Sequence, residues 1–363
     1  MMDKIIDQAW LALLASVVKK RVLLRPEMGD DIDLYLPQSR LLSLVESNPA
    51  MPKLLYASAQ SSASRNAYNI VRKLGMPPDY FWKFEYWPRA RALTNLSQIV
   101  KRVFSSMMVQ AREGNPEITG LDIDPLRINL EFSDCVECSG LSGLSYGVCY
   151  YHAGTFAGIL ASLINRELSS IETDCLARGD KSCRFVIGDK QDAEIQAKQE
   201  AYLAPPEFKT ELSSRLEKTL QNLPVRIIGD LVDINYYQLV LLNALLSDPE
   251  HLAASSFDVG CRVGRSLAPV LAKFYGREGL KNVIDYYAHL RQSRIEIKAE
   301  QPRLELEVKE CAEATGTGQR LEITSFLSGE LQGLISVTTG AEVTLEENRF
   351  EDDRLFLAFV PKA

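Results

Sequence analysis

The feature that most constrains the fold of this chain is a long internal repeat. The segment Leu34 to Gln60 is echoed by Asp233 to Phe257, because each places an apolar, helix-like run before a Ser-Asn-Pro or Ser-Asp-Pro step. Further along, "INLEFSDC" is matched by "LELEVKEC" and "GTFAGIL" by "GELQGLI", in the same order and at similar spacing. A two-copy period of this length predicts duplicated domains rather than a solenoid.

The repeat divides the chain into four parts. The segment between the copies is charged, is broken by Pro205-Pro206 and has helical patterns on both sides, so it predicts a linker with two helices. We therefore predict an N-terminal amphipathic helix over residues 1–24, a first domain over 25–190, a helical linker over 191–224 and a second domain over 225–363.

Each copy reads as helices first and strands afterwards. Alternating residues predict a strand from Ile128 onward, and we expect a second strand from Ser145 to Tyr151 that leads into a helix from Ala153 to about Arg166. A hairpin then turns at Arg178-Gly179-Asp180. Strands clustered with helices beside them predict an α+β fold with an antiparallel sheet in each copy.

Charge and hydropathy exclude some classes of protein. A formal net charge of −7 disfavours a general binder of nucleic acid or anionic membranes, because both need a basic face. The apolar run Ala9 to Val18 is shorter than the about 20 residues that span a bilayer. We interpret it as part of an amphipathic helix, with docking to a membrane surface or a partner as the alternative. We expect a cytoplasmic protein, whose seven cysteines stay reduced and are available to metals.

Two cysteines of the hairpin and a nearby glutamate indicate a metal site. Cys175 and Cys183 flank the turn, Glu172 precedes Cys175 by three residues, and Cys149 comes just before the predicted helix. Residues three apart in a regular strand point to opposite faces, so convergence needs a bulge near Thr173. Four protein ligands leave no open position on a tetrahedral zinc, which makes such a site structural rather than hydrolytic.

The same residues carry a family resemblance. The arrangement resembles the 4-vinyl reductase domain family in Cys149, Gly154, Gly158, Glu172-x-x-Cys175, Gly179-Asp180 and Cys183-x-Phe185. That family includes a bacteriochlorophyll-biosynthesis protein and the aromatic-sensing domains of phenol- and toluene-responsive activators. It belongs to a ligand-binding superfamily shared with nitric-oxide-sensing haem domains and a Golgi-transport tethering subunit.

The resemblance implies a site and a mode of action. In the phenol-sensor branch the matching residues bind a structural zinc beside the effector pocket, which implies zinc ligation here by Cys149, Glu172, Cys175 and Cys183. Members of the superfamily usually bind or transmit rather than catalyse. The sensors' ATPase module, DNA-binding motif, pocket histidine and pocket tryptophan have no counterpart in this sequence.

Two alternative ligands remain on the sequence. Cys135 and Cys138 could replace Cys149 and Glu172 to give a four-cysteine site, but they lie in a strand-like run without a glycine between them. Because Cys311 repeats Cys135 in a copy without other metal ligands, we interpret Cys135 as a core residue. His152 also has metal-ligand spacing from Cys149, and we assign it to the start of the helix and the lining of the pocket.

The second copy keeps the pattern and loses the ligands. Arg349, Phe350 and Phe356 fall near the positions of Cys175 and Cys183, and no thiol matches Cys149. Phenylalanine can fill a thiolate's volume and stabilise the hairpin by packing. We therefore predict no metal in this copy, which would act as a structural or dimerisation partner or as a second pocket.

The predicted ligand is a hydrophobic or planar small molecule. The stretch "YFWKFEYWPRAR" contains Trp82 and Trp87, which could form a stacking wall, a protein-binding patch or a core helix. With His152, Gly154 and Gly158 they form the predicted ligand-binding set, because glycines let a ligand or backbone approach closely.

The sequence predicts a binding function. We expect a non-catalytic binding or carrier protein with a structural zinc, whose ligand could be a tetrapyrrole or chlorophyll precursor, for pigment supply or photosystem assembly in photosynthesis. One alternative is an interaction scaffold or assembly factor that pairs with itself or with a protein partner. The other is a vinyl reductase of tetrapyrrole biosynthesis. The sequence has no dinucleotide or phosphate-binding motif, which disfavours the enzyme.

Overall fold

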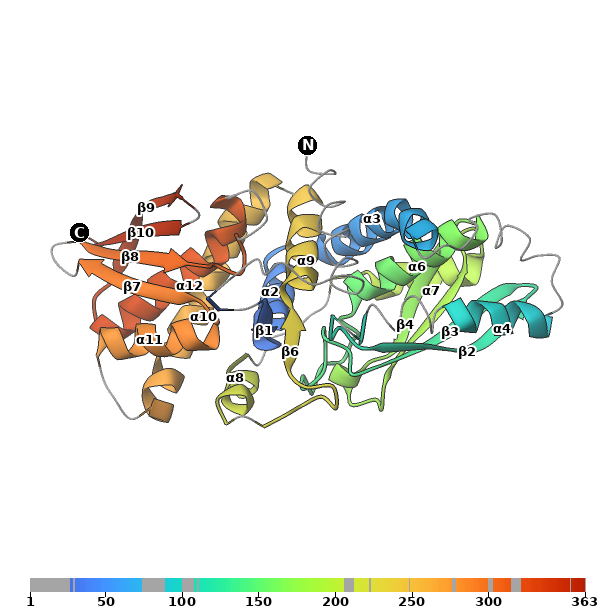
Figure 1. Cartoon of the computed structure of the whole chain (residues 1–363), viewed down its shortest axis with the longest axis horizontal. Coiled ribbons are helices and arrows are strands. Elements are labelled where there is room, and N and C mark those ends of the chain that lie inside the picture. The colour runs from blue at the N-terminus through green and yellow to red at the C-terminus, as the bar shows by residue number, and fades with distance from the viewer. Residues whose placement is uncertain are drawn as a thin grey trace. The chain divides into compact units, whose positions relative to one another are not determined.

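The computed structural model describes most of the chain (Figure 1). The described residues are 27–28, 30–73, 89–99, 108–109, 111–205, 212–221, 223–247, 249–275, 279–299, 303–314, 321–352 and 354–362. The predicted N-terminal helix, Trp82 and Trp87 lie outside these residues. No helix among the described residues is long and apolar enough to cross a bilayer.

The chain separates into two compact units. Unit 1 comprises the described parts of Pro49–Phe208 together with Val225–Asp230, and unit 2 comprises those of Val22–Asn48, Lys209–Pro224 and Leu231–Ala363. This division groups residues 22–48 with the C-terminal sheet, although the repeat in the sequence placed them in the first copy.

Unit 1 is built on a four-stranded antiparallel sheet. The strands are β2 (Asn115–Ile123), β3 (Leu126–Ser133), β4 (Leu168–Asp174) and β5 (Cys183–Asp189), in the order β2-β3-β5-β4. Buried residues alternate with half-buried ones along β3, as its sequence predicts for a strand with one face on a core. The predicted α+β class with an antiparallel sheet is confirmed.

A tightly packed helix pair accompanies this sheet. Helix α6 (Tyr150–Ile164) packs against β4 on one side and α3 (Met51–Lys73) on the other, which explains why nearly all its residues are buried. A Cβ at Gly154 would lie 2.2 Å from the backbone oxygen of Tyr56, and one at Gly158 would lie 2.2 Å from that of Gln60. Only glycine fits such a close helix approach. Both predicted pocket glycines therefore face α3, and their contribution to ligand binding stays a prediction.

The start of α6 corrects one sequence prediction. The expected strand from Ser145 to Tyr151 is wrong, because residues 145–149 form bends and coil and Tyr150 is already helical. The remaining helices of unit 1 are α4 (Arg89–Ile99) and α7 (Ala193–Tyr202). Asp192 caps α7 by accepting hydrogen bonds from the backbone N–H groups of Glu194 and Ile195.

Unit 2 has a four-stranded antiparallel sheet of the same order. Its strands follow the order β7-β8-β10-β9 and have the bounds β7 (Arg294–Ala299), β8 (Leu304–Lys309), β9 (Val343–Glu351) and β10 (Arg354–Pro361). Its helices are α2 (Tyr35–Ser47), α8 (Leu212–Leu220), α9 (Ile234–Ser247), α10 (Pro249–Tyr275), α11 (Leu280–Leu290) and α12 (Leu321–Thr339). A short antiparallel pair, β1 (Asp31–Asp33) and β6 (Leu231–Asp233), precedes α2 and α9.

Unit 2 repeats the close helix pairing. Helices α10 and α12 pack together, and glycines lie at the contact on both of them. A Cβ at Gly264 would lie 1.9 Å from the backbone oxygen of Glu330, and one at Gly333 would lie 2.1 Å from that of Cys261. Both units therefore use glycine to bring the helix that follows the second strand against a preceding long helix.

Ion pairs lie in the core of unit 2. The fully buried guanidinium of Arg291 pairs with the carboxylates of Glu313 and Glu330. The hydroxyl of Tyr287 donates to Glu330 at 2.6 Å, and that of Tyr237 donates to Glu313 at 3.2 Å. Buried charges need such partners, because an unpaired ion in a protein core is costly.

Candidate metal centre

The β4–β5 hairpin positions three of the predicted ligands. The register of β4 against β5 shifts between Glu172 and Asp174, so Thr173 forms the predicted bulge. A 3₁₀ turn at Leu176–Arg178 follows Cys175, and Gly179 continues the turn at a φ of 96°. The extra residue turns Glu172 and Cys175 toward the same side of the sheet. The bulge and the turn at Gly179 are both confirmed.

Cys149 joins these residues from the helix side. It is the N-cap residue of α6, and its backbone N–H donates to Oε2 of Glu172 at 3.1 Å. Gly147 makes room for that carboxylate, because a Cβ there would lie 2.2 Å from Oε2. The sequence analysis did not single out Gly147, although a glycine two residues before a candidate ligand was a usable signal.

Two further cysteines reach the same place. Cys135 and Cys138 lie beyond the end of β3, in a turn where the backbone N–H of Ser139 donates to the carbonyl of Cys135 at 2.9 Å. Their assignment to a strand-like run is wrong, because Asp134 adopts a φ of 52° and the strand ends at Ser133. The interpretation of Cys135 as an ordinary core residue missed this turn.

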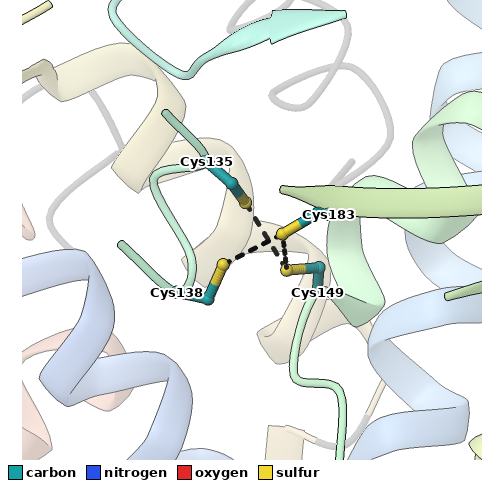
Figure 2. A group of neighbouring side chains, drawn as sticks. All are labelled: Cys135, Cys138, Cys149 and Cys183. Atoms are coloured by element: carbon teal, nitrogen blue, oxygen red, sulfur yellow. Dashed lines mark hydrogen bonds between the residues drawn. The ribbon is translucent and has the colours of Figure 1, made fainter. Parts of the chain in front are cut away.

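The five thiols form one buried cluster, four of which are drawn in Figure 2. The Sγ atoms of Cys135 and Cys149 are 3.4 Å apart, and those of Cys138 and Cys183 are 3.2 Å apart. Two sets of four residues keep all their ligand atoms within 4.8 Å of one another. One is the predicted set, Cys149, Glu172, Cys175 and Cys183, and the other is Cys135, Cys138, Cys149 and Cys183.

The donors fit a metal ion. Thiolates and carboxylates are the groups that hold zinc and other thiophilic ions, and every candidate ligand is buried. The second carboxylate oxygen of Glu172, Oε1, is buried without a hydrogen-bond partner. A buried carboxylate oxygen without a donor is costly, and a cation would satisfy it. The cluster can therefore hold a metal ion.

Burial sets the electrostatics of the cluster. It raises the pKa of the Glu172 carboxyl well above its ordinary value, and it raises the pKa values of the Cys138 and Cys149 thiols in the same way. The hydrogen bond with Cys138 instead lowers the pKa of Cys175. In this environment a bound cation would favour ionisation of all these groups, because it repays the cost of their desolvation.

His152 lies next to the cluster but bonds to carboxylates. Its Nδ1 is 2.8 Å from Oε1 of Glu137, and its Nε2 is 3.4 Å from Oε2 of Glu113. Burial alone would lower the pKa of His152, but the charge of Glu137 and hydrogen bonds from Cys135, Glu113 and Glu137 raise it well above its ordinary value. His152 is fully buried and does not line the cavity described next, so its predicted role in the pocket stays a prediction.

A cavity of about 530 Å³ opens beside Glu172. Three tyrosines give it an aromatic lining, Tyr146, Tyr150 and Tyr202, and the rings of the last two lie 5.2 Å apart. Arg178 and Lys198 contribute positive charge to its lining. Because Glu172 belongs both to the cavity and to a ligand set, this cavity adjoins the candidate metal centre.

A second cavity of about 640 Å³ is lined by residues of α3 and α6. Its lining is mostly polar or charged and includes Ser61, Ser64, Arg65 and Arg166. Gly158 lies on its wall, but no candidate metal ligand does. It therefore serves as an internal reference for the cavity beside Glu172.

Comparison with known proteins supports the class of domain. Residues 128–189 match the model of the 4-vinyl reductase domain. The match runs from β3 to the end of β5 and includes all five clustered cysteines and Glu172. This part of the chain is therefore a 4-vinyl reductase domain, and the comparison does not extend that assignment to the C-terminal sheet.

Two curated relatives come from Methanocaldococcus jannaschii. The uncharacterized protein MJ0150 is 26% identical over 84 residues, which cover 23% of this chain and 47% of the relative. The uncharacterized protein MJ1642 is 35% identical over 60 residues, which cover 16% of this chain and 37% of the relative. The chain thus spans less than half the length of either relative.

Two solved structures resemble parts of the chain. One is the phenol-responsive sensory domain of the transcription activator PoxR with phenol, at 15% identity and a TM-score of 0.34, covering 51% of this chain and 85% of that one. The other is a trafficking protein particle complex subunit 3 from Naegleria fowleri covalently bound to palmitic acid, at 13% identity and 0.32, covering 42% and 95%. Because both TM-scores are below 0.5, neither likeness bears on the function of this chain.

Proposed function

We propose that this protein is a non-catalytic binder of a hydrophobic or planar small molecule, held in the cavity beside Glu172. The observation that carries the proposal is the shared position of Glu172, which lines the cavity and belongs to a buried ligand set. A volume of about 530 Å³ lies in the range of small-molecule sites. The match to the 4-vinyl reductase domain over residues 128–189 supports the same class of function.

The cavity lining supports an aromatic ligand with a polar group. Tyr150 and Tyr202 offer ring faces and edges for packing, which favours planar compounds. Burial raises the pKa of Tyr202 well above its ordinary value, so its hydroxyl stays neutral and can donate. That hydroxyl is buried without a hydrogen-bond partner, and a ligand oxygen would satisfy it. A tetrapyrrole or chlorophyll precursor is the finer form of this proposal and rests on the family resemblance.

We propose zinc as the metal and Cys149, Glu172, Cys175 and Cys183 as its ligands. Three thiolates and one carboxylate are a zinc-type donor set, and four protein ligands would leave a closed, structural site. Such an ion would fix Glu172 at the cavity wall and tie the hairpin to the start of α6. The free state of all the cysteines in the described structure supports a reducing, cytoplasmic location.

We also propose that the two units arose by duplication, with copies at 25–190 and 225–363. The shared strand order of their sheets and the glycine contacts of their helix pairs support this. Unit 2 would then be the copy without metal, because both ligand sets found among the described residues lie in unit 1.

A pair of matched variants tests the binding site. Ala201 lines the cavity beside Glu172 and Ala57 lines the reference cavity, and both are exposed on helices, so tryptophan at either position should leave the fold intact. The probes are 2-naphthol and protoporphyrin IX, titrated into the metal-loaded full chain by calorimetry. We expect Ala201→Trp to weaken binding of at least one probe about tenfold or more, a loss of about 1.4 kcal/mol, and Ala57→Trp to leave it unchanged. Equal affinities in both variants, or no binding of either probe by the wild type, would contradict the proposal.

A further inference from the structure

The two candidate ligand sets overlap in a specific way. Both contain Cys149 and Cys183, and each adds two residues of its own. Cys135 and Cys138 complete one set, and Glu172 and Cys175 complete the other. Six residues thus form two tetrahedra of donors that share one edge.

The distances suit a pair of ions that share this edge. In a tetrahedral zinc site with bonds of about 2.3 Å, neighbouring sulfurs lie about 3.8 Å apart. The Sγ atoms of Cys149 and Cys183 are 3.8 Å apart. The contacts from Cys135 to Cys149 and from Cys138 to Cys183 are 3.4 Å and 3.2 Å, which a bound ion would lengthen by a few tenths of an ångström.

One ion leaves donors unused. A tetrahedral ion takes four ligands, so a single zinc in the predicted set would leave the thiols of Cys135 and Cys138 packed against its bridging sulfurs. Two ions with two shared sulfurs use all six residues. When all are ionised, five thiolates and one carboxylate carry six negative charges, and a second divalent ion halves the charge that remains in this buried place.

We propose that these residues hold two zinc ions bridged by the thiolates of Cys149 and Cys183. The ion between Cys135 and Cys138 is enclosed by sulfur alone. The ion between Glu172 and Cys175 adjoins the cavity, because Glu172 lines it. Each thiol that binds a metal gives its proton to solvent, and no oxidation or reduction occurs. This inference extends the single-zinc site of the proposed function and rests on it.

The two positions differ in their hold on the metal. A carboxylate binds zinc less firmly than a thiolate, so the ion beside Glu172 exchanges more readily than the ion in the four-cysteine set. A molecule in the cavity would lie next to the exchangeable ion and away from the enclosed one. The arrangement therefore assigns a permanent, structural role to one ion and a ligand-responsive role to the other.

Metal stoichiometry of the full chain is the first test. Protein purified with zinc in excess, then desalted, is analysed by inductively coupled plasma mass spectrometry, and we expect about two zinc ions per chain. The double variants Cys135→Ser/Cys138→Ser and Glu172→Gln/Cys175→Ser should each retain about one. Cys311→Ser, which alters a thiol in the turn after β8, is the matched control and should keep both ions.

A second measurement needs no variant. The wild-type protein is stripped of metal under reducing conditions and titrated with cobalt(II), which takes up the same ligands and is paramagnetic. We expect the electron paramagnetic resonance signal to grow up to about one equivalent and to fall as the second ion binds, because bridging thiolates couple the two spins magnetically. Two ions in separate sites would give a signal that grows throughout, and this outcome would overturn the bridge.

The outcomes separate this inference from the proposed function. One zinc per wild-type chain, lost on Glu172→Gln/Cys175→Ser and kept on Cys135→Ser/Cys138→Ser, would overturn the binuclear centre and leave the single site standing. One zinc with the opposite pattern would overturn both assignments. Iron with acid-labile sulfide in place of zinc would also overturn both.

Discussion

Gly147→Ala should weaken metal binding without changing a ligand. A Cβ at this position would lie 2.2 Å from Oε2 of Glu172, whereas carbon and oxygen atoms without a bond between them rarely approach within 3.0 Å. The carboxylate must therefore retreat by about 1 Å, while metal–oxygen bonds tolerate changes of only about 0.2 Å. The backbone itself accepts alanine, because Gly147 is not among the glycines with positive φ.

The size of the effect follows from the loss of this one ligand. Disturbing the residues that orient metal ligands typically costs about 10- to 100-fold in metal affinity, and we expect a loss in that range or larger. This corresponds to about 1.4–2.8 kcal/mol of binding free energy. Because metal binding adds to the free energy of unfolding, the variant should gain less thermal stability from zinc than the wild type does.

Competition with a chromophoric zinc chelator at fixed pH measures the affinity, and thermal unfolding with and without zinc measures the linkage. Ser145→Ala is the control, because Ser145 is exposed and lines the same cavity two residues earlier. A folded Gly147→Ala protein that binds zinc as tightly as the control would refute the reasoning, since Glu172 would then not be a ligand.

Three further predictions concern the cluster and the core of unit 2. Cys183→Ser should lose nearly all bound zinc, whereas Cys261→Ser, outside both ligand sets, should keep it; zinc analysis of the two purified variants checks this. Glu330→Gln should lower the free energy of unfolding by about 3–5 kcal/mol in urea denaturation, because it leaves the buried Arg291 with one carboxylate fewer. The same change at the exposed Glu342, which pairs with Arg265, should cost at most about 1 kcal/mol, and equal costs would contradict the argument. Gly333→Ala should destabilise unit 2 by about 1–3 kcal/mol, because its Cβ would lie 2.1 Å from the Cys261 carbonyl oxygen; Val337→Ala, on the exposed side of the same helix, should change it far less in the same titration.

The sequence was informative wherever the signal was local. The hairpin was readable because Gly179 permits the turn and because Glu172 and Cys175 could converge only through a bulge. The α6 helix was readable from its apolar pattern, although it begins at Tyr150, earlier than expected. In each case the constraint and the residue that meets it lie within a few positions of each other.

The sequence was misleading where the outcome depended on distant contacts. The run before α6 looked like a strand, but Gly147 and Cys149 lie there against Glu172, a contact that no local pattern encodes. Cys135 was taken for a core residue because the strand end at Ser133 depends on the left-handed backbone of Asp134. Asparagine and aspartate tolerate this conformation, but it could not be inferred without the neighbouring strand.

The ion pairs of Arg291 give the two halves of the molecule different needs for nutrients. The core of unit 2 supplies its own counter-charges in Glu313 and Glu330, so its folding draws on nothing outside the chain. Unit 1 would depend on zinc imported by the cell. Under zinc starvation we expect newly made chains to mature in one half only, with proteases attacking the other. The amount of this protein would then follow the zinc status of its host, even at a constant rate of synthesis.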